Sequence, residues 1–238
     1  LVALITLMSN AEAEEKPLYT EIVTSFGGSE NDTFSKAAQT SDGGLVVVGY
    51  SFSTDGDMSD IRKVEGSGAP DAIIIKYNPE NVIQWKKSFG GSQTDAFNFV
   101  KQTNDGGYIA VGSSRSNDFD MTGLNKGAND AVIVKYDSSG NIQWKQSFGG
   151  MGDDTFTSVE QLSDGSYVAV GYTNSTNGDL SGMNIKGYDA IAVKYSSSGS
   201  MVWKKKFGGT SGTIVEKFTG VVKSDYGGFF AVGAIGSS

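Results

Sequence analysis

An internal repeat of 59 residues is the strongest constraint on the fold of this chain. The phrase Ser-Phe-Gly-Gly, or Lys-Phe-Gly-Gly in its last copy, is centred in turn on Phe26, Phe89, Phe148 and Phe207. The intervals between these phenylalanines are 63, 59 and 59 residues, and the four extra residues of the first interval fall between Gly49 and Asp71. A constant period of this length indicates a tandem array of similar supersecondary units.

The sequence pattern of each repeat unit predicts four β-strands. In the third unit, residues 155–162 alternate apolar and polar side chains, which is the pattern of a half-buried strand. Residues 167–172 form a continuous apolar run, as expected of a strand that is covered on both faces. Residues 189–195 and 201–207 are the other two strand segments. The 33 glycines and 3 prolines of the chain suit many tight turns.

Four antiparallel strands in every unit are typical of the blade of a β-propeller. Arrays of paired helices need a helical period, and leucine-rich repeats are shorter. A tandem array of small β-sandwiches is the structural alternative, but such domains need about 100 residues each. We therefore predict an all-β protein, a β-propeller of four-stranded antiparallel blades. The blades are expected at residues 29–91, 92–150 and 151–209, with a partial blade at 210–238.

The predicted array is incomplete. Residues 19–28 match the end of a unit, so they predict a single fourth strand with no strands of its own before it. The last unit stops after its second strand. We expect a partial or open propeller of about three and a half blades that belongs to a longer protein. An unpaired sheet edge of this kind favours aggregation.

The N-terminal residues predict export. Residues 1–8 are an apolar run that is followed by Ala11-Glu12-Ala13, as at the end of a secretory signal peptide. The run is too short to span a membrane. We expect a partial signal peptide over residues 1–13 and a secreted or cell-surface protein over 14–238, although a buried first strand is the alternative.

The repeat carries four motifs in a constant order: Phe-Gly-Gly-x-x-x-Asp, Asp-Gly-Gly before an apolar run, Asp-Ala before a run that ends in Lys-Tyr, and Ile-Gln-Trp-Lys. Together they resemble the β-propeller repeats of bacterial secreted and cell-surface proteins, such as clostridial ones. The resemblance covers residues 19–238. It implies an extracellular binding module but no particular ligand.

Composition excludes several kinds of function. The net charge of −8 argues against binding to nucleic acid or to anionic membranes. The chain has no Cys and no His, which excludes disulfides, thiol nucleophiles, Ser-His-Asp triads and His-ligated zinc. An enzyme built from this sequence would depend on carboxylates, Tyr, Lys or Ser.

The long polar loops contain a candidate calcium site. Acidic residues recur there at a constant offset after the second strand: Asp55, Asp57, Asp118, Asp120 and Asp179. Pairs of oxygen ligands two residues apart resemble the start of a calcium-binding loop. No Glu occupies the twelfth position that such a loop requires. The alternative is that these carboxylates cap their own turns by accepting hydrogen bonds from nearby backbone N–H groups.

Residues that recur in every unit are expected to be structural. The Asp-Gly turns at Asp42, Asp105, Asp164 and Asp225 predict hairpins. We expect backbone hydrogen bonds at the blade junctions from Asp32, Asp95 and Asp154. We expect blade packing from Trp85, Trp144 and Trp203. The side chains expected to extend from a sheet edge towards solvent are Lys76, Lys135 and Lys194.

Residues that occur in one unit only are the candidate ligand-binding residues. The first long loop contributes Arg62, Lys63 and Glu65, the second contributes Arg115 and Phe119, and Tyr188 ends the third. Long loops on a rigid scaffold are where recognition is usually found.

These observations favour a non-catalytic extracellular binding or scaffold module for a protein or glycan ligand. One rival is a propeller glycosidase or lyase that uses paired carboxylates, although no non-repeated carboxylate pair stands out. The other rival is a passive spacer within a larger surface protein.

Overall fold

The computed structural model shows an all-β protein, as the repeat predicts. The structure describes residues 2–9, 19–61, 68–209 and 215–235. Within these ranges the sheets are antiparallel, and the helices are three single 3-10 turns: η1 (Gly56–Met58), η2 (Phe119–Met121) and η3 (Gly178–Leu180). No helix in the described ranges is long and apolar enough to cross a membrane.

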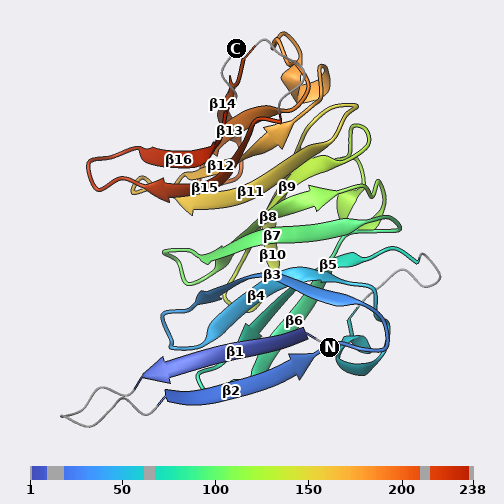
Figure 1. Cartoon of the computed structure of the whole chain (residues 1–238), viewed down its shortest axis with the longest axis vertical. Coiled ribbons are helices and arrows are strands. Elements are labelled where there is room, and N and C mark those ends of the chain that lie inside the picture. Colours follow the sequence, from blue (N-terminus) through green and yellow to red (C-terminus); the bar gives the residue numbers. More distant parts are fainter. Residues whose placement is uncertain (1, 10–18, 62–67, 210–214, 236–238) are drawn as a thin grey trace.

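Three four-stranded sheets account for most of the chain (Figure 1). The first sheet contains β3 (Asp32–Gln39), β4 (Leu45–Ser51), β5 (Asp71–Tyr77) and β6 (Ile83–Phe89). The second contains β7 (Asp95–Gln102), β8 (Tyr108–Ser114), β9 (Asp130–Tyr136) and β10 (Ile142–Phe148). The third contains β11 (Asp154–Gln161), β12 (Tyr167–Thr173), β13 (Asp189–Tyr195) and β14 (Met201–Phe207). Each strand pairs with the next in the chain, which confirms the prediction of four strands per unit.

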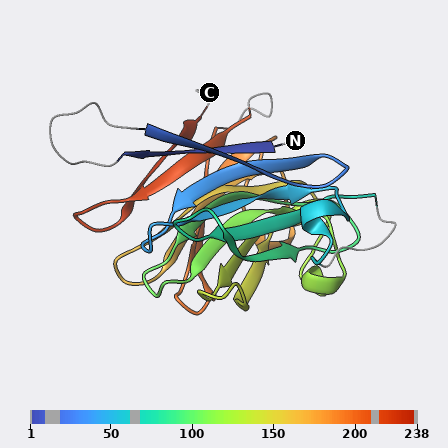
Figure 2. The ribbon, with the colours of Figure 1, turned by 90° about the horizontal axis from the view of Figure 1, so that it is seen from below.

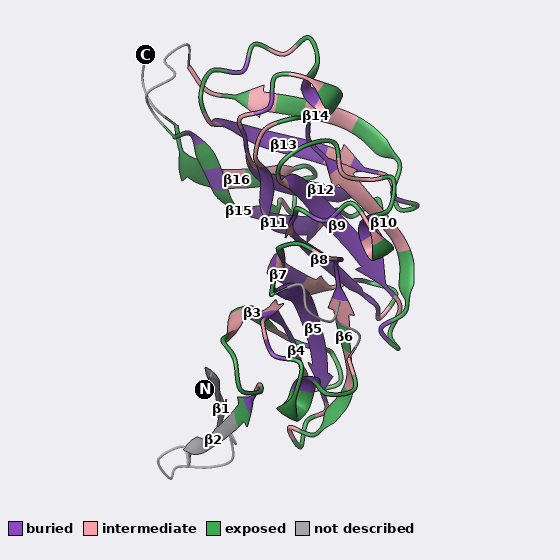
Figure 3. Cartoon of the chain, turned by 90° about the vertical axis from the view of Figure 1, so that its right-hand side faces the viewer, coloured by how far each residue is buried: buried purple, intermediate pink, exposed green. Residues whose placement is uncertain are grey.

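The sheets are stacked in chain order. The first strands of successive sheets contact one another, β3 with β7, β7 with β11, and β11 with β15. A hydrophobic cluster fills each interface: Val48, Ile74 and Phe97 belong to the first, and Ile133, Phe156 and Ile191 to the second. Strands β5 and β9 are buried along their whole length (Figure 3). Neighbouring sheets cover both faces of β9, whereas β5 packs on the second sheet with one face and against Phe26 and Met58 with the other. Their continuous apolar sequences follow from this burial.

Each first strand contains a register irregularity at the same place. In β7 the pairing with β8 shifts between Phe97 and Phe99, next to the pair Phe97–Gly112. A Cβ at Gly112 would collide with the carbonyl oxygen of Ala96. A bulge of this kind increases the local twist of a strand. The glycine in the middle of the second strand is therefore required by the close approach of the first strand.

The repeated tryptophans pack between sheets, as predicted. The Trp85 indole N–H donates a hydrogen bond to the carbonyl of Ser138, 3.0 Å away in the β9–β10 turn of the next sheet. The Trp85 ring also meets Tyr108 edge-on, with 5.5 Å between the ring centroids. Trp144 repeats both contacts one sheet later, with Ser197 and Tyr167.

The prediction for the repeated lysines was wrong. Lys76 and Lys135 lie on the third strand of a sheet, inside it rather than at its edge, and only 2% of each side chain is exposed. The Lys76 Nζ is 2.9 Å from the Asp42 carboxylate and donates to the carbonyl of Tyr77. The Asp-Gly hairpin, which forms as predicted, carries this carboxylate over the buried ammonium group. Hydrogen bonds from the Thr40 hydroxyl and from Lys76 lower the pKa of Asp42 to about 2.

Two-stranded sheets lie at both ends of the stack. β1 (Val2–Ser9) pairs with β2 (Tyr19–Phe26), so the strand predicted over residues 19–28 has a partner within the segment expected to be a signal peptide. Phe26 packs on the first sheet, 5.9 Å from the Phe34 ring. At the other end, β15 (Lys217–Lys223) pairs with β16 (Phe229–Ala234) as the first two strands of a fourth unit.

We predict that Asp105→Ala lowers the free energy of unfolding by about 1–3 kcal/mol, because it leaves the buried Lys135 ammonium without its carboxylate partner. The double variant Asp105→Asn/Lys135→Met should lose less, because no unpaired charge remains. Asp225→Ala is the matched control, since Asp225 occupies the same turn of the β15–β16 hairpin without a third strand beside it among the described residues. Urea denaturation of the three variants measures these differences. An equal loss in Asp105→Ala and Asp225→Ala would contradict the prediction.

Candidate functional site

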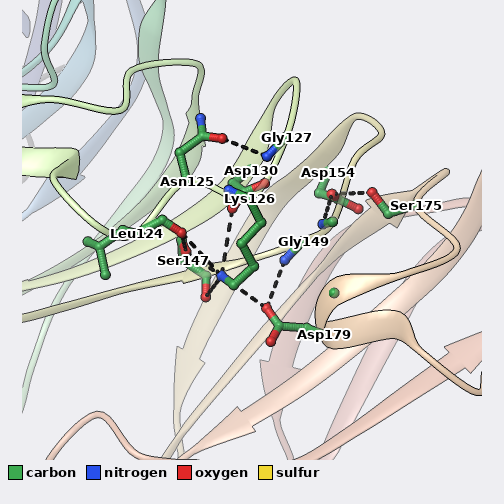
Figure 4. A network of polar contacts seen from close by, with 12 residues as sticks. Leu124, Asn125, Lys126, Gly127, Asp130, Ser147, Gly149, Asp154, Ser175 and Asp179 are labelled. Atoms are coloured by element: carbon green, nitrogen blue, oxygen red, sulfur yellow. Dashed lines mark hydrogen bonds and ion pairs between the residues drawn. The ribbon is translucent and has the colours of Figure 1, made fainter.

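The Phe-Gly-Gly segments join consecutive sheets and are held by carboxylates. In the second sheet, Asp95 Oδ2 accepts the Gly91 N–H at 2.8 Å, and Asp118 Oδ1 accepts the Ser92 N–H at 2.8 Å. In the third sheet, Asp154 Oδ2 accepts the Gly150 N–H at 3.0 Å and a hydrogen bond from the Ser175 hydroxyl (Figure 4). Asp32 makes the same contact with Gly28. The prediction that these aspartates accept backbone hydrogen bonds at the junctions is confirmed.

The candidate calcium ligands also face backbone donors. Asp57, Asp120 and Asp179 accept N–H groups from Gly27, Gly90 and Gly149, and Asp55 accepts the N–H of Ser29. Capping is therefore observed, but its donors lie 26 to 30 residues earlier in the chain rather than in the same turn. No group of three or more acidic side chains within the described ranges is arranged to hold a metal ion. Calcium at these loops stays a prediction.

Phe119 occupies a strained position at one of these caps. Its φ of 47° lies in the left-handed region, where the equivalent residues of the first and third units are Gly56 and Gly178. The cap is looser here, because the Asp120 N–H lies 3.2 Å from the Gly90 carbonyl, whereas the same bond is 2.9 Å in both other units. Figure 2 shows the turns η1 (cyan) and η2 (green) on the same side of the stack. The Phe119 side chain is 54% exposed.

A second carboxylate lies behind each junction, and sequence analysis did not single it out. Asp130, at the start of β9, is fully buried, and its Oδ2 accepts the Lys126 N–H at 3.0 Å. The Lys126 Nζ lies 3.7 Å from Asp130 and 3.2 Å from Asp179, and it donates to the Ser147 hydroxyl at 2.6 Å (Figure 4). Asp130 Oδ1 has no hydrogen bond.

The Asp130 and Asp154 carboxylates converge on Gly149. A Cβ at Gly149 would lie 2.6 Å from Asp130 Oδ1 and would collide with Asp154 Oδ2. Burial raises the pKa of Asp130 to about 6, against the opposing effect of Lys126. Burial also raises the pKa of Asp154. The pair is enclosed by the junction, so it is part of the fold rather than a site that is open to a ligand.

Two of the six candidate ligand-binding residues meet in one pocket. We call it the Arg115 pocket, and its lining residues are Arg115, Asn129, Asp153, Thr155, Tyr172, Tyr188, Val215 and Lys217. Its volume is about 360 Å³. Arg115 follows β8, Tyr188 precedes β13, and Lys217 begins β15, so three units contribute to it. Pockets of this size are suited to small ligands or to part of a larger one.

Asp153 is the centre of this pocket. Its Oδ1 is 3.7 Å from the Arg115 Nη2, and its Oδ2 accepts the Tyr188 hydroxyl at 3.4 Å. The Tyr188 ring meets Tyr172 edge-on at 5.7 Å between centroids. Partial burial and the Asp153 charge raise the pKa of Tyr188, so its hydroxyl remains a donor at neutral pH.

The equivalent positions one junction earlier form a pocket of different chemistry. This Tyr50 pocket has a volume of about 380 Å³ and is lined by Tyr50, Phe52, Gly68, Ala69, Pro70, Thr94 and Ala96. Phe52 stands at the repeat position of Arg115, and Thr94 at that of Asp153. The two pockets adjoin, because the Arg115 N–H donates to the Thr94 carbonyl at 2.9 Å. The same backbone geometry thus presents apolar groups at one junction and charged groups at the next.

The other candidate residues lie elsewhere. Phe119 is on η2 and does not line the Arg115 pocket, and Arg62, Lys63 and Glu65 fall outside the described residues. Asp153 and Lys217 were not predicted, because the candidate ligand-binding residues were taken only from the long loops. A comparison of the units position by position would have found both, since Asn31 and Thr94 occupy the place of Asp153, and Thr33 and Ala96 that of Lys217.

No protein-family model matches the chain, and no curated protein does.

We predict that Phe119→Gly raises the free energy of unfolding by about 1 kcal/mol, because it removes a positive-φ strain of that order. The matched control is Gly178→Ala, which should lower stability, because a Cβ there lies 2.5 Å from the Gly149 carbonyl oxygen. Thermal denaturation measures both changes. A destabilised Phe119→Gly variant would show that the side chain contributes more to folding than its backbone costs.

Asp130 should make stability depend on pH. The pKa of Asp130 in the folded protein lies above the ordinary value of 3.8. The contribution of Asp130 to folding stability is therefore fully present below pH 3.8 and is lost as the pH rises through about 6. The free energy of unfolding of the wild type should therefore fall, relative to Asp130→Asn, by about 2–3 kcal/mol between pH 4 and 7. Urea titrations across this range measure the difference. Asp137→Asn, in the exposed β9–β10 turn, should show no such trend, because hydrogen bonds from Asn141 lower the pKa of Asp137.

Proposed function

We propose that this chain is part of a bacterial β-propeller and acts as a non-catalytic binding module. The stacked four-stranded sheets, with their first strands in mutual contact, support this proposal, because propeller blades are also four-stranded sheets placed side by side. The apolar N-terminal run before Ala11-Glu12-Ala13, together with the resemblance of the repeats, supports a secreted or cell-surface protein.

The observation that carries the binding function is the Arg115 pocket. Residues that recur in every unit build the sheets and their junctions. Arg115, Asp153 and Lys217, by contrast, each occur once at their repeat position and lie around one pocket. Unit-specific side chains on a uniform framework are expected of a recognition site, because the framework itself does not need them.

A protein or a glycan is the ligand class that this pocket suits. It combines aromatic rings with hydroxyl, amide, guanidinium and carboxylate groups. A few convergent polar groups beside aromatic surface are typical of binding sites. A glycosidase or lyase gains no support from the Asp130–Asp154 pair, because both side chains are fully buried. A passive spacer would not need the unit-specific charges of the pocket.

The test is a screen of the whole chain on glycan and bacterial surface-protein arrays. We expect binding by the wild type and a loss of about tenfold or more in affinity for Arg115→Ala, which corresponds to about 1.4 kcal/mol. Lys223→Ala is the control, because it removes the same charge from an exposed position of β15 outside the pocket. Absence of any ligand for the wild type, or equal binding by Arg115→Ala, would refute a binding role for this pocket.

A further inference from the structure

The charges of the Arg115 pocket differ in sign from those of the protein as a whole. Its lining contains two cations, Arg115 and Lys217, and one carboxylate, that of Asp153, in a chain whose net charge is −8. The Asp153 carboxylate already has partners within the pocket, because its two oxygens face Arg115 and Tyr188. The pocket therefore offers a net positive charge on an acidic protein, which favours an anionic ligand.

The Arg115 guanidinium lies near Asp153 but does not form a hydrogen bond with it. The separation of 3.7 Å between Nη2 and Oδ1 is an ion-pair distance, but it is too long for a hydrogen bond. Arg115 is also 49% exposed, so its fork of N–H donors can reach a ligand. Lys217 forms no ion pair with any residue that the structure describes, and it is exposed at the start of β15. A carboxylate between these two cations would receive a bidentate hydrogen bond and a second charge.

The rest of the pocket suits a polyhydroxylated ring. Thr155 and the two tyrosines carry hydroxyl groups, and Asn129 offers both an amide donor and an amide acceptor. A mixture of donors and acceptors matches sugar hydroxyls, which also both donate and accept. The rings of Tyr172 and Tyr188, which meet edge-on, provide apolar surface against which the C–H face of a sugar can pack. An acidic peptide side chain would need the cations but not this set of acceptors.

We propose that the Arg115 pocket binds an acidic saccharide, with the sugar carboxylate between Arg115 and Lys217 and the ring beside Tyr172. This assignment rests on the binding function proposed above and names its ligand class. Asp153 is a positioning residue that orients the Arg115 guanidinium and the Tyr188 hydroxyl. The adjoining Tyr50 pocket lies at the equivalent junction and has no charged side chain among the described residues that line it, so it provides an internal comparison.

The experiment is calorimetric titration of the whole chain with trisaccharides of galacturonate, glucuronate and mannuronate. The methyl ester of each is the matched neutral ligand. We expect at least one acid to bind about tenfold or more tightly than its ester, and this preference to weaken as salt is raised. Arg115→Gln and Lys217→Gln should each abolish the preference. Phe52→Ala, at the same repeat position in the Tyr50 pocket, should retain it.

Four outcomes would overturn the proposal. Equal affinity for acid and ester would remove the role of the carboxylate. An Arg115-dependent preference for a polyglutamate peptide over every uronate would assign the pocket to a peptide. Failure of all uronates, while another glycan or protein on the arrays still binds in an Arg115-dependent manner, would refute the acidic saccharide and leave the binding function standing. A chain that binds nothing on either assay would refute both.

Discussion

The hydrogen bond from the second glycine of each Phe-Gly-Gly segment to a carboxylate is the interaction on which the stack depends. In the second sheet it joins Gly91 to Asp95, which is the first residue of β7. The preceding Gly90 has a φ of 141°, and a Cβ there would collide with this carboxylate. The chain thus leaves one sheet and enters the next through a fixed geometry. Where the fourth unit has Glu216 instead of Asp, both of its oxygens accept the Gly209 N–H.

This junction also determines where variable side chains can be placed. Because the carboxylates and glycines of every unit are committed to it, the positions beside it can differ from unit to unit without loss of the fold. Thr94 and Asp153 illustrate this freedom, since they precede equivalent junction aspartates and line pockets of opposite character. The proposed binding surface is thus a by-product of the way the sheets are joined.

Most of the fold could be predicted from sequence, because alternation and apolar runs depend on local burial. The junction aspartates could be predicted as well, since repetition beside Gly-Gly marks a backbone role. Lys76 could not be placed, because the pattern does not reveal that its strand is interior and that a hairpin carboxylate covers it. The pocket was only half predicted: Arg115 and Tyr188 were found as unit-specific residues, but Lys217 becomes their neighbour only when the third and fourth units pack together.

The buried aspartates at the start of the third strands have different cationic partners in different units. Lys126, from the long loop, lies beside Asp130, whereas Lys206, from β14, lies 3.1 Å from Asp189. The second and third units therefore each carry their own counter-ion, so either unit could be duplicated during evolution without leaving a buried charge unpaired. Exchange of a loop alone is different. Replacing the second long loop by the third would substitute Ile185 for Lys126 and leave Asp130 opposite Ser147, where the third unit has Lys206. Exchange of a loop alone would thus destabilise the second unit, whereas exchange at the Phe-Gly-Gly segments keeps Asp130 with its counter-ion.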